Sequence, residues 1–71
     1  MQHIDARVVE SETRFHIEAI SDKAEQWLEK NIVKMPLKLS YTFDKATGSS
    51  IQREMLEAGM TLHVIEVSYQ N

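Results

Sequence analysis

The sequence predicts an α+β fold in which a sheet of about four antiparallel strands is covered by helix on one face. Alternating apolar and polar residues predict strands in four segments, and helical spacing or strong helix formers mark two segments between them. The predicted order is strand, strand, helix, strand, helix, strand. With 71 residues and a mass of 8.2 kDa, the chain has room for one domain, which we place at residues 1–71.

The first two strands are predicted to form a hairpin. Residues 13–20 carry an apolar side chain at every second position, which is typical of a half-buried strand. Residues 4–8 show the same period, with Asp5 on the polar face. The polar residues 10–12 lie between these segments and are suited to the turn.

A helix is predicted over residues 22–31. Ser21 is suited to cap it, because a serine hydroxyl can accept a hydrogen bond from a free amide of the first turn. Asn31 is expected to end the helix. The helical spacing predicts one buried stripe made of Ala24, Trp27, Leu28 and Ile32.

The third strand is predicted within residues 33–43, where apolar residues again occupy every second position. Pro36 lacks a backbone N–H, so it must begin this strand or lie on an edge. We therefore expect residues 37–43 to form the central part of the strand.

Residues 44–58 allow two interpretations. In both, residues 44–48 form a turn that contains a glycine. In the first interpretation Ser49 or Ser50 caps a helix that Gly59 ends, and Ile51, Met55 and Ala58 form its stripe. In the second, the turn closes a hairpin and residues 49–53 are a strand. The strong helix formers that follow Ile51 favour the helix.

The last strand is predicted over residues 60–69 and is apolar on both faces. Such a strand is usually central, bulged or covered by another chain. One face carries Met60, Leu62 and Val64, and the other carries Ile65, Val67 and Tyr69. The predicted core contains Phe15, Ile17, Trp27, Leu28, Leu37, Leu39, Tyr41, Leu62 and Val64.

Catalytic and metal chemistry find little support in the sequence. The chain has no cysteine, and its three histidines, His3, His16 and His63, lie in separate strands rather than at a ligand spacing. If strands 13–20 and 60–69 paired, two of them could be neighbours. Residues 47–50 resemble part of an anion-binding turn but lack the spacing of a phosphate loop. We expect no enzyme, no metal and no cofactor.

The carboxylates favour the same interpretation. Glu54 and Glu57 have the spacing of a solvated helix face. Glu66 lies in the most apolar strand, where it could face solvent or oppose Lys38 across the sheet.

Charge is unevenly distributed along the chain, although the net charge is only −3. Residues 10–29 carry a net charge of −4 and residues 30–53 a net charge of +4. The basic block suggests, as an alternative function, a nucleic-acid-binding accessory protein that uses Lys34, Lys38, Lys45 and Arg53. Tyr41 shares the apolar face of its strand, which is poor geometry for stacking a base beside these lysines.

The favoured function is a small non-catalytic protein-interaction module, such as an adaptor, inhibitor or accessory protein. A sheet edge and an apolar surface would bind an unknown protein partner, and we expect a homodimer through strand 60–69. The partner-binding residues predicted are Lys34, Lys38, Ile65, Val67 and Tyr69. The longest apolar runs are pairs, so we expect no membrane span and a cytoplasmic protein. Short acidic domains without cysteine are common among accessory proteins of phages and bacterial operons.

Overall fold

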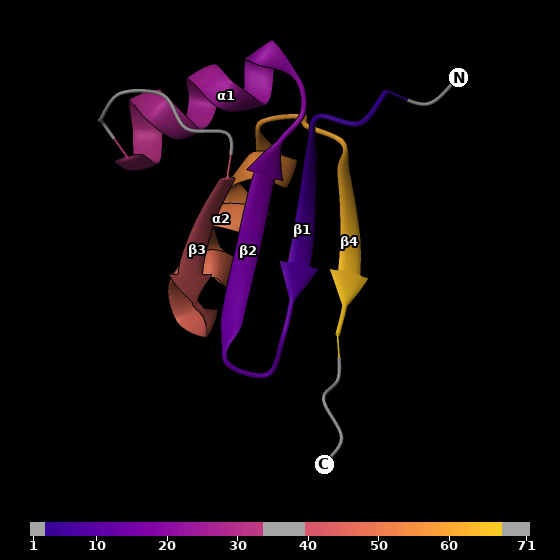
Figure 1. The fold of residues 1–71 in the computed structure, drawn as a ribbon. Helices are drawn as coiled ribbons and strands as arrows, with labels where there is room; N and C mark the ends of the chain where they lie inside the picture. Colours follow the sequence, from indigo (N-terminus) through magenta and orange to yellow (C-terminus); the bar gives the residue numbers. More distant parts are fainter. Residues whose placement is uncertain (1–2, 34–39, 68–71) are drawn as a thin grey trace.

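The computed structural model describes residues 3–33 and 40–67 and confirms the α+β class (Figure 1). No helix in these two ranges is long and apolar enough to cross a membrane. The elements in chain order are β1 (Ala6–Glu10), β2 (Arg14–Ala19), α1 (Asp22–Leu28), a π-helical turn η1 (Glu29–Val33), β3 (Ser40–Asp44), α2 (Lys45–Glu57) and β4 (Leu62–Glu66).

The four strands form one mixed sheet in the order β3-β2-β1-β4. β2 is antiparallel to both β1 and β3, whereas β4 is parallel to β1. The expectation of a wholly antiparallel sheet is therefore wrong for this last pair. The reason is the connection: the chain leaves β3 at one edge, passes through α2 and enters β4 at the opposite edge in the same direction (Figure 1). The condition under which His16 and His63 could be neighbours, pairing of strands 13–20 and 60–69, is not met, since β1 separates β2 from β4.

The predicted hairpin is confirmed, and β1 extends further toward the turn than expected. Glu10 belongs to β1 and lies opposite Phe15. The Ser11 amide donates to the Arg14 carbonyl at 2.9 Å, and the Arg14 amide donates to the Ser11 hydroxyl at 3.2 Å. These bonds satisfy backbone groups that the ladder leaves unpaired at the turn.

Ser21 caps α1 as the sequence predicts. Its backbone is extended, and its hydroxyl accepts from the Ala24 amide at 3.1 Å. The end of the helix differs from the prediction, because the chain continues into η1 through Val33. Asn31 lies inside η1, where its side-chain amide donates to the Trp27 carbonyl at 2.9 Å, so it does not end the helix.

The second helix is confirmed and the alternative hairpin is wrong. The helix begins earlier than expected, because Asp44 rather than a serine is its cap and the predicted turn forms its first residues. The Thr47 amide donates to the Asp44 carboxylate at 2.8 Å. Hydrogen bonds from the Thr47 side chain and then its amide lower the pKa of this carboxyl below its usual value. Gly59 follows the helix end with φ at 87°, a conformation that favours glycine.

Gly48 lets α2 lie directly against the sheet. A Cβ atom at this position would lie 2.2 Å from Cβ of Phe15 on β2. Figure 1 shows α2 behind β2 and β3, the two strands with which it makes its main contacts. The close approach explains why a poor helix former is buried within the first turns of a helix.

The core lies between one face of the sheet and the two helices. Val64 was predicted to lie in the core, and this prediction is wrong, because the residue is on an edge strand and is 40% exposed. Ala58 is also exposed, at the end of α2, and the predicted positions Leu37 and Leu39 lie outside the described residues. The buried apolar residues are Ala6, Val8, Phe15, Ile17, Ala19, Ala24, Leu28, Ile51, Met55 and Met60, with Trp27, Ile32, Tyr41, Phe43 and Leu62 partly buried against them.

Candidate interaction surface

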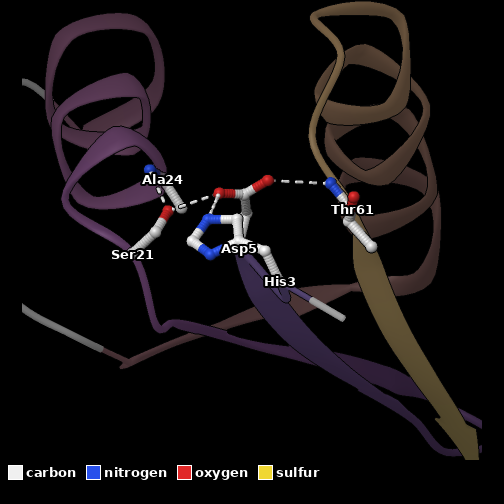
Figure 2. A network of polar contacts seen from close by, with 5 residues as sticks. All are labelled: His3, Asp5, Ser21, Ala24 and Thr61. Atoms are coloured by element: carbon white, nitrogen blue, oxygen red, sulfur yellow. Dashed lines mark hydrogen bonds and ion pairs between the residues drawn. The ribbon is translucent and has the colours of Figure 1, made fainter. Parts of the chain in front are cut away.

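Asp5 is the one buried polar residue among those described, and it joins three segments of the chain. One carboxylate oxygen accepts hydrogen bonds from the Ser21 hydroxyl at 2.7 Å and from Nε2 of His3 at 2.9 Å. The other accepts from the Thr61 amide at 2.9 Å. Figure 2 shows this cluster at the point where β1 begins, α1 is capped and the chain enters β4. We call these residues the Asp5 junction.

Hydrogen bonding favours the ionised form of Asp5. The Thr61 amide is the largest cause and the Ser21 hydroxyl the second, and together with His3 they lower the pKa of Asp5 to about 2 despite its burial. The backbone of Asp5 adds further bonds, since its carbonyl accepts from the amides of Ile20 and Ser21 at 2.8 and 3.0 Å. A carboxylate this fully bonded is suited to fastening chain segments.

The Asp5 junction does not have the geometry of a nucleophilic triad. A triad needs a serine bonded to a histidine that can accept its proton. Here the Ser21 hydroxyl and His3 both bond to the same oxygen of Asp5, and Ser21 also accepts from the helix amide of Ala24. The Ser21 hydroxyl therefore donates its proton in a hydrogen bond to a carboxylate rather than to a histidine. This arrangement supports a structural role.

Sequence reasoning missed the Asp5 junction. It placed Asp5 on the polar face of a strand, whereas the residue is 4% exposed and precedes β1. Its bonding partners Ser21 and Thr61 lie 16 and 56 positions along the chain. No local pattern could have indicated partners at such separations; only the strand order β2-β1-β4 brings them together.

The remaining histidines lie on the open face of the sheet, opposite the helices. His16 on β2 contacts the Thr42 hydroxyl on β3 at 3.2 Å. His63 on β4 is in register with Arg7 on β1, so β1 lies between the two histidines. Within the described part of the chain, no three potential ligands gather in a way that could hold a metal ion.

Lys45, part of the predicted basic block, is used inside the fold. Its ammonium donates to the Glu10 carboxylate at 2.6 Å and to the Ser11 carbonyl at 3.1 Å, and it lies 5.2 Å from the centre of the Phe15 ring. Glu66 on β4 is exposed, as one of its two expected arrangements requires, and is in register with Glu10; Lys38, the other expected neighbour, lies outside the described residues. Lys45, Glu10 and Glu66 line a shallow hollow at the ends of β1 and β4.

The outer edge of β4 is the most open apolar part of the sheet. β4 has β1 as its one neighbour in the sheet order. On the helix-covered face, Val64 is in register with Val8, yet Val8 is fully buried and Val64 is 40% exposed. On the open face, Ile65 is in register with Val9, and both are partly buried. We call the outward backbone groups of β4 together with Val64 the β4 edge.

The backbone groups of β4 divide between β1 and the β4 edge in a regular way. The Val67 amide donates to the Glu10 carbonyl at 2.8 Å, and the Thr61 carbonyl accepts from the Asp5 amide at 2.8 Å. Successive residues of a strand direct their N–H and C=O groups to opposite sides. Odd-numbered residues of β4 therefore bond to β1. Leu62, Val64 and Glu66 direct their backbone groups outward.

Two of the five predicted partner-binding residues lie in the described part of the chain. Ile65 is on β4, and Val67 follows it with its amide bonded to β1. Lys34, Lys38 and Tyr69 lie outside the described residues. The structure confirms a strand within residues 60–69, but Val64, which the sequence assigned to the core, is an exposed apolar side chain of that strand.

A further exposed apolar residue, Leu56, lies on α2 and is 51% exposed. It shares one flank of the helix with Lys45, Ser49 and Gln52, because these positions follow helical spacing. Since Lys45 reaches Glu10 on β1, this flank is directed toward the β1 and β4 side of the sheet. The helix layer therefore offers a second apolar side chain on the side of the β4 edge.

Comparison with protein-family models, curated proteins and solved structures finds no match to this chain. The functional argument therefore depends on the fold and on the chemistry of its surfaces.

Proposed function

We propose that the protein is a small non-catalytic interaction module, an adaptor, inhibitor or accessory protein of the cytoplasm, that binds a protein partner through the β4 edge. One observation carries the proposal: β4 has a strand on one side, and its central side chain, Val64, is 40% exposed beside the fully buried Val8.

An open strand edge binds protein by a simple mechanism. Its outward N–H and C=O groups form a ladder with an added strand, and the neighbouring side chains select what is added. Natural proteins usually protect such an edge with lysine, proline or a bulge. The five residues of β4 include no lysine and no proline, and Glu66 at the end of the strand is their one acidic group. This composition favours pairing with another strand.

Nucleic-acid binding receives less support. Lys45 bonds to Glu10, so its charge is balanced within the fold. Tyr41 lies on the helix-covered face, partly buried with Phe43 at a ring-centre distance of 6.2 Å. An aromatic side chain in this position cannot stack on a base beside exposed lysines.

The proposal is tested by affinity capture from native cells with the wild type and two proline variants. Val64→Pro removes an outward N–H of β4 and keeps the residues that bond to β1. Thr42→Pro is the matched control on the opposite edge, since Thr42 lies on β3, whose one neighbour is β2. We expect proteins that the wild type retains to be lost with Val64→Pro and kept with Thr42→Pro.

Equal loss with both proline variants would contradict the proposal, provided that circular dichroism shows both to be folded. An oligonucleotide retention assay provides the competing outcome. Tight retention that falls steeply between about 50 and 200 mM salt, through release of counterions, would favour the nucleic-acid alternative.

A further inference from the structure

We infer that the strand that fills the β4 edge is β4 of a second copy of this chain, antiparallel and related by a two-fold axis, with Val64 opposite Val64. The two sheets then form one eight-stranded sheet with both helix layers on the same face. This inference rests on the proposed function and names the partner and the register.

Symmetry restricts how two β4 strands can pair. A two-fold axis perpendicular to the sheet makes the strands antiparallel and keeps equivalent faces together. Because the outward backbone groups belong to Leu62, Val64 and Glu66, these residues must form the hydrogen-bonded pairs across the axis. The strand is five residues long and Val64 is its middle residue, so centring on Val64 gives the longest ladder, with Leu62 opposite Glu66 at each end.

The apolar side chains support the same centre. On the helix-covered face, one row of apolar residues runs across all four strands, each residue paired with the next: Tyr41, Ile17, Val8 and Val64. This row ends at the exposed Val64. In the proposed pairing it continues directly into the equivalent row of the second copy, and part of the exposed surface of Val64 is buried against the Val64 of that copy.

Polar and charged side chains disfavour two of the other registers. Centring on Glu66 would place two carboxylates opposite each other, with Glu10 beside each of them in the next strand. Centring on His63 would oppose two imidazoles that each lie beside Arg7. Centring on Val64 separates the two Glu66 side chains by four residues, or roughly 14 Å along the strand.

Single cysteines test both the partner and the register, because the natural chain contains none. The variants are His63→Cys, Val64→Cys and Ile65→Cys, with Thr42→Cys on the β3 edge as the control for random collision. In a hydrogen-bonded antiparallel pair the Cα atoms lie about 5.5 Å apart, within the range that a disulfide spans. Under mild oxidation we expect Val64→Cys to give the fastest covalent dimer and Thr42→Cys the slowest.

Light scattering of the wild type completes the experiment. We expect a mass near twice 8.2 kDa at micromolar concentration, falling to 8.2 kDa for Val64→Pro. A faster crosslink at position 63 or 65 would overturn the register. A wild type that stays monomeric, with no crosslink above the control, would overturn the second copy as partner. In that case the proposed function still stands if capture of another protein depends on Val64, and it fails if capture does not.

Discussion

Val8 and Val64 are the same residue type, in register on adjacent parallel strands and on the same face of the sheet, yet Val8 is fully buried and Val64 is 40% exposed. The difference follows from position: the main contacts of α2 are with β2 and β3, β1 lies between two strands, and β4 lies at the edge of the sheet away from these contacts. The sheet therefore has a covered part that stabilises the fold and an uncovered edge that is available to a partner.

The largest effect is expected in the covered part, for Gly48→Ala. Alanine normally stabilises a helix relative to glycine by roughly 1 kcal/mol. Here the added Cβ would lie 2.2 Å from Cβ of Phe15, an atom fixed to the β2 backbone, so helix and sheet must separate. We expect a net loss of about 1–3 kcal/mol in the free energy of unfolding, measured with urea.

Ser49→Ala is the matched control for Gly48→Ala, because Ser49 is exposed on the same helix and alanine is the better helix former. It should leave stability equal or slightly higher. If Gly48→Ala proved stabilising as well, α2 could not lie as close to β2 as the structure shows.

The second largest effect is expected at the Asp5 junction, which attaches the start of β4 to the covered part of the sheet. The folded-state pKa of Asp5, about 2, lies below the usual value of 3.8 for this side chain, so folding favours the carboxylate. Its contribution to stability is present above the unfolded pKa and is lost as the pH falls from about 4 toward 2. Asp5→Asn should therefore lower stability at neutral pH and weaken the decline of stability in acid.

The Asp5 prediction is measured as the urea midpoint against pH, with Asp22→Asn as the control. Asp22 is an exposed carboxylate in the first turn of α1, close in sequence to the junction residue Ser21. We expect the Asp22 variant to keep the acid dependence of the wild type. An unchanged acid profile in Asp5→Asn would mean that hydrogen bonds from Thr61 and Ser21 do not hold this carboxylate in solution.

Local signals in the sequence predicted much of the covered part. The Ser21 cap, the hairpin and the buried stripe of α1 depend on residues close in the chain, and these predictions are confirmed. The start of α2 was missed because residues 44–48 have the composition of a turn. Contact with Phe15, about thirty positions away, makes Gly48 favourable inside a helix.

The uncovered edge could be predicted only in part. The pattern of residues 60–69 indicated a strand that is apolar on both faces, and β4 lies within this segment. Its edge position and its parallel pairing with β1 follow from the crossover through α2, which no local pattern encodes. For this reason the sequence placed Val64 in the core and could not identify the Asp5 junction.

The sharpest test of the comparison is the matched pair Val8→Ala and Val64→Ala, of which Val64→Ala is expected to have the smaller effect on the isolated chain. Both changes remove the same two methyl groups. At Val8 they come from a closed core, so we expect a loss of roughly 2 kcal/mol at every protein concentration, from lost transfer energy and a cavity. In the isolated chain the Val64 side chain is in contact with solvent, so the expected loss is within about 0.5 kcal/mol in dilute solution.

Urea unfolding at increasing protein concentration distinguishes the two variants, because pairing with a second copy buries Val64 and links stability to concentration. The cost of Val64→Ala should then rise with concentration while that of Val8→Ala stays constant. A cost at Val64 that matched Val8 in dilute solution would show that the edge is already covered within one chain.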